Sequence, residues 1–115
     1  MQTIPRMKKI LLCSSNRILT RSLYGMLRDE GHAVEDVEHP SLAVRKVLDG
    51  AYDFTIIDAE PFGLSAEDAA QVIKAIAPAM PILCIGGGPG CDHLHLLKLP
   101  ADLAAIRELL HVIAA

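Results

Sequence analysis

Short apolar runs alternate with longer segments of helical period along this 115-residue chain. Most of the runs are apolar without interruption, unlike a strand that has one face in water. Uninterrupted apolar strands are typical of a parallel sheet that helices cover on both faces. We therefore predict an α/β fold with strands at 8–13, 32–37, 53–58, 80–85 and 93–98, and with helices at 14–31, 39–50, 65–78 and 100–115.

The order of these elements restricts how the strands can pair. Right-handed crossovers leave few topologies, and one of them is the flavodoxin-like strand order 2-1-3-4-5. In such sheets the functional loops lie at the carboxyl ends of the strands. We therefore expect Asp58, Ser14, Ser15, Gly86 and Lys98 at one edge of the sheet, because each ends or follows a predicted strand.

Residues that prefer helix ends mark the predicted helices. Ser14 or Ser15 is expected to cap the first helix, and Gly31 to end it. Pro40 lies near the start of the second helix and Gly50 just past its end. The third helix is expected to open with Ser65 and the acids that follow it. Helical spacing predicts buried positions at Leu19, Leu23, Met26 and Leu27 in the first helix and at Ala69, Val72, Ile73 and Ile76 in the third.

Composition limits the class of protein. Apolar residues make up 51% of the chain and aromatic residues 3%, so we expect one domain over residues 1–115, with a tail at 1–7 and an aliphatic core. The net charge of −3 argues against direct nucleic-acid binding, and no apolar run reaches the roughly 18 residues of a membrane span. Cys13, Cys84 and Cys91 do not form a disulfide framework, and the first two lie in apolar runs as core residues. We expect a cytoplasmic protein.

The segment "FTIIDAEPFG", in which an apolar strand ends at Asp58, resembles the phosphoacceptor strand of response-regulator receiver domains of two-component systems. The resemblance extends from Lys9 to Ile113 and includes "LLKLPADL", which is similar to the Lys-Pro signature after the fifth strand of that family. It implies a CheY-like fold, with Asp58 in the phosphoacceptor position. It also implies that Lys98 takes the position that contacts the phosphoryl group.

The chain departs from the family at the residues that would hold a metal ion. The resemblance implies two acids after the first strand that bind Mg²⁺, and here those positions are Ser14 and Ser15. Two hydroxyls supply no charge to a cation that prefers carboxylate oxygens. We therefore predict no metal site, and expect Mg²⁺ as a cofactor only if Asp58 is nevertheless phosphorylated.

Two further departures affect the signalling switch of the family. A hydroxyl residue is implied directly after the fourth strand, where this chain has Gly86, and an aromatic residue three positions before Lys98, where it has His95. Glycine cannot hydrogen-bond a phosphoryl oxygen through a side chain. We interpret Gly86 and His95 as degenerate switch positions, and Asp58 with Lys98 as a charge pair that holds the loops together.

The connection between the fourth and fifth predicted strands is short and rich in glycine. Its length leaves no room for the helix that a parallel crossover normally contains, so we expect the fourth crossover helix to be missing or very short. Its absence would uncover apolar residues at a sheet edge, where we predict an interface for a homodimer or a partner. We assign Leu94, Leu96, Leu97 and the predicted final helix to this interface. The equal alternative is that the glycine-rich loop covers the patch.

We therefore hypothesise an atypical receiver domain without enzymatic activity, which acts by protein–protein contact and in which phosphorylation is lost or inefficient. A histidine kinase and the output domain of a longer regulator are the expected partners. One alternative is a receiver that is still phosphorylated on Asp58 by a histidine kinase. A second is a small nucleotide-binding module. A zinc site at Cys91, His93 and His95 is not favoured, because these supply only three ligands.

Overall fold

The computed structural model describes residues 8–59, 64–86, 95–97, 104, 107 and 108. The elements follow each other as β1 (Lys9–Cys13), α1 (Arg17–Asp29), β2 (Ala33–Val37), α2 (Pro40–Asp49), β3 (Phe54–Asp58), α3 (Leu64–Ile76), β4 (Ile82–Ile85) and β5 (His95–Leu97). They occupy the predicted segments, with ends that differ from the predicted ones by at most three residues. No helix in the described part of the chain is long and apolar enough to cross a membrane.

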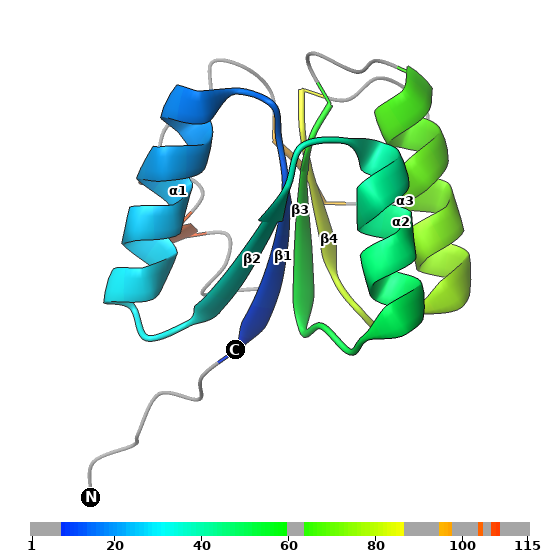
Figure 1. The fold of residues 1–115 in the computed structure, drawn as a ribbon, viewed down its shortest axis with the longest axis horizontal. Coiled ribbons are helices and arrows are strands. Elements are labelled where there is room, and N and C mark those ends of the chain that lie inside the picture. Colours follow the sequence, from blue (N-terminus) through cyan, green and yellow to red (C-terminus); the bar gives the residue numbers. More distant parts are fainter. Residues whose placement is uncertain (1–7, 60–63, 87–94, 98–103, 105–106, 109–115) are drawn as a thin grey trace, which may run out of the picture.

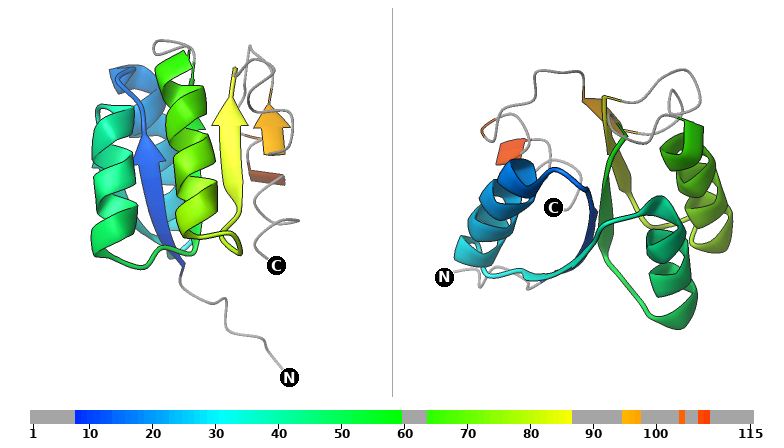
Figure 2. Two further views of the ribbon diagram at one scale, coloured as in Figure 1. Left: turned by 90° about the vertical axis from the view of Figure 1, so that its right-hand side faces the viewer. Right: turned by 45° about the horizontal axis from the view of Figure 1, so that its top comes forward.

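The strands form one parallel sheet with the order β2-β1-β3-β4-β5. This confirms the predicted flavodoxin-like topology. The sheet stands between two helical layers, with α1 against one face and the adjacent helices α2 and α3 against the other (Figures 1 and 2). All the paired strands point the same way, so their carboxyl ends meet at one edge, which is at the top of Figure 1 together with the start of α1.

Alternate residues of the strands supply the two cores of the molecule. Successive side chains of a strand point to opposite faces, so Ile10 and Leu12 face α1 while Leu11 and Cys13 face α2 and α3. The core beside α1 contains Ile10, Leu12, Leu23, Met26, Leu27, Phe54, Ile56, Leu83 and Ile85. The core beside α2 and α3 is built from smaller residues, including four alanines, Ala43, Ala59, Ala66 and Ala70. Both cores are largely aliphatic, as the composition predicted.

The start of α1 differs from the sequence-based expectation. Neither Ser14 nor Ser15 caps this helix: the Asn16 side chain accepts hydrogen bonds from the backbone N–H groups of Ile18 and Leu19, at 3.1 and 3.2 Å. An N-cap residue must accept from the amides two or three positions ahead, and Asn16 is the residue at that spacing. The prediction of a serine cap was therefore wrong.

The other helix ends agree better with their predictions. Gly31 follows α1 with a φ of 89°, a left-handed conformation that favours glycine. Pro40 is the first residue of α2, and Gly50 caps its end. The helix α3 begins at Leu64, one residue before the predicted Ser65. The buried positions predicted for α1 are confirmed at Leu23, Met26 and Leu27, and Leu19 is partly buried.

The predicted buried face of α3 was wrong in part. Ala69 and Ile73 are buried as expected, but Val72 and Ile76 are 46% and 38% exposed. The face that contacts the sheet centres on Ala66, Ala70 and Ile73 and includes Ala69 at its side. Several successive positions of this helix are apolar, so the sequence pattern left the orientation of the helix about its axis undecided.

The fifth strand is confirmed as a short strand parallel to β4 at the end of the sheet. Residues 87–94, which include the predicted gap in place of a fourth crossover helix, lie outside the described residues. So does the tail at 1–7. Of the predicted final helix, Ala104, Arg107 and Glu108 are helical, and its other residues lie outside the described part.

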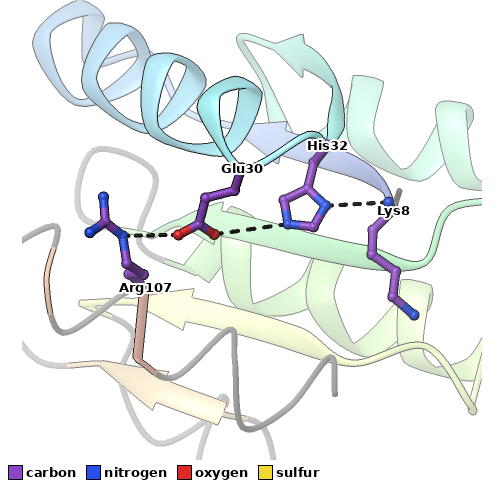
Figure 3. Close-up of polar contacts among 4 residues, drawn as sticks. All are labelled: Lys8, Glu30, His32 and Arg107. Carbon is purple, nitrogen blue, oxygen red and sulfur yellow. Dashed lines mark hydrogen bonds and ion pairs between the residues drawn. The ribbon is translucent and has the colours of Figure 1, made fainter. Parts of the chain in front are cut away.

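A chain of polar contacts joins the last helix to the end of α1 (Figure 3). The Arg107 Nε lies 3.0 Å from Glu30 Oε1, and the other oxygen of Glu30 lies 4.0 Å from His32 Nε2. On its other side, His32 Nδ1 accepts a hydrogen bond from the backbone N–H of Lys8 at 3.3 Å. These contacts place Arg107 beside the end of α1.

Candidate functional site

Asp58 is the last residue of β3, at the carboxyl edge of the sheet. It is 2% exposed and directly follows the buried strand residues Ile56 and Ile57. The register of the sheet pairs Cys13 with Ile57, so the residues one step further, Ser14 and Asp58, become neighbours. Both positions continue the side-chain alternation of their strands onto the α1 side of the sheet. The sheet geometry therefore places a serine beside the aspartate.

Ser14 makes a direct hydrogen bond to Asp58. Its hydroxyl donates to Asp58 Oδ2 at 2.9 Å, and the Ser14 Oγ itself accepts a hydrogen bond from the backbone N–H of Asn16 at 3.0 Å. Ser14 is only 4% exposed, and its own N–H donates to the carbonyl of Val37. A buried carboxylate needs hydrogen-bond donors, and Ser14 is positioned to be one of them.

The two serines in the acidic-pair positions are therefore not equivalent. Ser14 is buried and points at Asp58, whereas Ser15 is exposed. Sequence reasoning treated the two positions alike, because it could not tell which side chain faces the aspartate. Of the two, Ser14 is the one that contacts the carboxylate.

The described residues at this edge do not supply the donor set that Mg²⁺ prefers. Within the described residues, no three His, Cys, Asp or Glu side chains gather. Asp58 is the carboxylate at the end of β3, and one of its oxygens already accepts the Ser14 hydroxyl. Mg²⁺ in proteins is held by carboxylates and waters in strict octahedral geometry, and a neutral hydroxyl adds no charge to balance the cation.

Gly86 follows β4, in the position where the family resemblance implies a hydroxyl residue. Its φ is 70°, in the left-handed region that residues with a side chain rarely adopt. A β-branched residue such as threonine is strained in this conformation. The backbone of this turn thus favours glycine, independently of any signalling role.

Cys13 lies under the site and is fully buried. Burial raises the pKa of its thiol to about 12, and the nearby negative charge of Asp58 contributes to the rise. A thiol with so high a pKa carries almost no thiolate at neutral pH and is unreactive. Cys84 is also buried, so the prediction that both cysteines are core residues is confirmed. Cys91 lies outside the described residues.

The Cys13 thiol is expected to make stability fall in alkaline solution. Its pKa is about 12 in the folded state and 9.0 in the ordinary thiol, so the stabilisation is fully present below pH 9 and is lost as the pH rises towards 12. The loss amounts to at most about 4 kcal/mol. Urea unfolding between pH 8 and about 11 would measure it. Cys13→Ala should show a shallower decline, and an identical decline in both proteins would contradict the assignment.

The remaining predicted site residues are described in part or not at all. His95 and Leu96 lie in β5 together with Leu97, beside β4. Lys98 and Leu94 lie outside the described residues, so their predicted roles stay predictions. The glycine-rich loop that could cover this interface also lies outside the described residues, so that alternative stays a prediction as well.

The structure also shows a pocket that sequence reasoning missed. It has a volume of about 270 Å³ and lies where β1 and β2 end and α1 begins. It is lined by Ser14, Ser15, Arg17, Thr20, Arg21, Asp36 and Glu38. The sequence signal that was available is the spacing of Arg17 and Arg21, which places both on one face of α1. Asp36 and Glu38 lie at the end of β2 and just after it, so only the fold shows that they line the same pocket as the arginines.

Comparisons with known proteins agree with this architecture. TrrA, a response regulator of Thermotoga maritima solved in complex with Mg²⁺-BeF, has a TM-score of 0.82 and 20% identity, and the match covers 93% of this chain and 99% of TrrA. A response regulator receiver protein of Sinorhizobium medicae has a TM-score of 0.81 and 24% identity over 95% of each chain.

The receiver domain of a Pseudomonas aeruginosa sensor histidine kinase, solved with magnesium in its active site cleft, has a TM-score of 0.76 and 22% identity, with 95% of this chain and 98% of that domain covered. TrrA has also been solved in complex with the histidine kinase ThkA. No protein-family model matches the chain, and no curated protein sequence matches it significantly. The strand order, the helical layers and these similarities together show that the chain has the CheY-like fold of response-regulator receiver domains.

Proposed function

We propose that this chain is an atypical receiver module of two-component signalling, which acts through protein–protein contact and whose Asp58 is phosphorylated inefficiently or not at all. The observation that carries the proposal is the hydrogen bond from the buried Ser14 hydroxyl to Asp58 Oδ2. This contact gives the carboxylate a neutral hydroxyl partner at a position where the family resemblance implies a metal-binding acid. Mg²⁺ normally neutralises the transferring phosphoryl group, and this donor set does not favour it.

The proposed partners are a histidine kinase and the output domain of a longer regulator. The complex of TrrA with ThkA supports the first, because TrrA shares the fold of this chain. The start of α1 is suitable for such a contact, since Ile18 is 80% exposed beside the site and is flanked by the exposed Arg17. The module itself is proposed to catalyse no reaction.

The deciding experiment uses the reagent with which TrrA was crystallised. The protein is incubated with Mg²⁺ and beryllium fluoride, and separately with acetyl phosphate and Mg²⁺, with TrrA as the positive control. We expect no change in amide chemical shifts near Asp58 and no phosphoryl adduct by intact mass, in contrast to TrrA. A shift or adduct that disappears in Asp58→Asn would support the alternative, a receiver phosphorylated on Asp58 by a histidine kinase with Mg²⁺ as cofactor.

Self-association at the β5 end of the sheet is a further part of the proposal. Within the described strands β5 is the last of the sheet, and an open sheet edge can pair with a second copy. Sedimentation velocity should show a dimer that Leu96→Glu dissociates, while Val72→Glu on the exposed side of α3 leaves it unchanged. A wild-type monomer at high micromolar concentration would remove this part of the proposal.

A further inference from the structure

The pocket beside Ser14 is lined by charges of both signs: arginines from α1 form what we call its basic wall, and acids from the end of β2 and beyond form its acidic wall. Arg17 and Arg21 project from the first two turns of α1, and Asp36 and Glu38 come from the end of β2 and the residues after it. Neither arginine and neither acid of this pocket forms an ion pair within the described part of the chain. Charged groups around one hollow that do not neutralise each other are available to a ligand.

The two walls favour different parts of such a ligand. Arginine guanidinium groups bind phosphate through paired hydrogen bonds, and the hydroxyls of Ser15 and Thr20 can add donors on the same side. Carboxylates repel a phosphate but accept hydrogen bonds from sugar hydroxyls. In dinucleotide-binding α/β domains, which also carry a glycine-rich phosphate loop, an acid accepts a hydrogen bond from a ribose hydroxyl in this way.

From this arrangement we infer that the pocket binds a ribose phosphate, with the phosphate on Arg17 and Arg21 and the sugar hydroxyls on Asp36 and Glu38. Its volume of about 270 Å³ lies near the lower limit of small-molecule sites, which favours one sugar phosphate unit over a dinucleotide. The ribose phosphate could be a free sugar phosphate or part of a mononucleotide. This inference does not depend on whether Asp58 is phosphorylated.

Ser14 connects this pocket to the candidate site. It lines the pocket, and its hydroxyl donates to Asp58. A ligand that contacts Ser14 would therefore act on the hydrogen bond that holds the carboxylate. The amide of Asp58 should respond to the ligand although Asp58 does not line the pocket.

Amide chemical shifts at constant ionic strength test the inference with ribose 5-phosphate, AMP, inorganic phosphate and ribose as probes. Ribose 5-phosphate or AMP should shift the amides of Ser15, Thr20 and Glu38 saturably. The probe with the lower Kd shows whether the ligand is a free sugar phosphate or a mononucleotide. Arg17→Gln/Arg21→Gln should raise the Kd of both by about tenfold or more. Arg45→Gln, which removes an exposed arginine from α2, is the matched control and should change neither Kd.

A second double variant tests the acidic wall of the pocket. Asp36→Asn/Glu38→Gln should raise the Kd of ribose 5-phosphate more than the Kd of inorganic phosphate, because only the sugar contacts this wall. The inference would be overturned by the absence of saturable shifts up to about 10 mM probe, which corresponds to negligible affinity. Equal binding of inorganic phosphate and ribose 5-phosphate would also overturn it, as would an unchanged Kd in the double arginine variant. Circular dichroism verifies that each variant is folded.

Discussion

Replacing Ser14 and Ser15 together with aspartate is expected to make the stability of this protein depend on Mg²⁺. Without the metal, Ser14→Asp brings a second carboxylate to a buried position where the wild-type hydroxyl lies 2.9 Å from Asp58 Oδ2. Two carboxylates that share one site repel each other, and the lost hydrogen bond adds to the cost. We expect the free energy of unfolding to fall by about 3–5 kcal/mol, a range typical of an uncompensated buried charge.

Added Mg²⁺ is expected to reverse this loss. A cation that binds only the folded state stabilises it by about 2.7 kcal/mol at a hundredfold excess over its Kd. Ser15 is exposed, so Ser15→Asp alone should change the stability by less than about 0.5 kcal/mol. Urea unfolding with and without Mg²⁺ measures both effects.

The matched control for this experiment is Ser14→Asn/Ser15→Asn, which adds side chains of similar size without charge. It should show no response to Mg²⁺, and neither should the wild-type protein. If Mg²⁺ stabilised the wild-type protein as much as the aspartate variant, the chain would already hold the metal. The view that its donor set does not fit Mg²⁺ would then be wrong.

The second large effect is expected in the core. Phe54→Ala should lower the free energy of unfolding by about 3–5 kcal/mol, as is typical of a fully buried aromatic residue replaced by alanine. Phe54 is fully buried at the start of β3, pairs with Ile10 across the sheet and packs in the core beside α1 with Leu23 and Leu27. The chain has two phenylalanines and no tryptophan, so aliphatic neighbours must fill the space that this side chain leaves.

Urea unfolding followed by circular dichroism measures this change, because the chain has no tryptophan to report fluorescence. Phe54→Leu keeps most of the side-chain volume and should cost less than the alanine variant. Val72→Ala is the surface control: Val72 is 46% exposed on α3, so its truncation should cost less than about 0.5 kcal/mol. A similar loss for Phe54→Ala and Val72→Ala would mean that the core beside α1 is not packed as described.

Several features could be predicted from the sequence because they depend on local pattern and chain connectivity. Apolar runs such as "ILLC" are typical of strands buried on both faces, and their alternation with helical segments leaves few parallel topologies. The position of Asp58 at the carboxyl edge follows from that topology. Gly31, Pro40 and Gly50 marked helix ends because their backbone preferences are intrinsic.

Other features depended on contacts between distant parts of the chain. Asn16, and not the predicted serine, caps α1 because the helix begins at Arg17, while the Ser14 hydroxyl contacts Asp58 and the Asn16 amide. The exposure of Val72 and Ile76 depends on how α3 is rotated against the sheet, which a helix with apolar residues at successive positions does not reveal.

The sequence by itself limited the sheet to a few parallel topologies, placed Asp58 at the carboxyl edge, and put Ser14 and Ser15 where the family resemblance implies an acidic pair. Only the tertiary structure decided that Ser14, and not Ser15, donates to Asp58, because strand register and side-chain alternation select one of the two. The tertiary structure also brought the arginines of α1 together with the acids at the end of β2 in one pocket. These residues are far apart along the chain, so no local pattern could predict that they share a site.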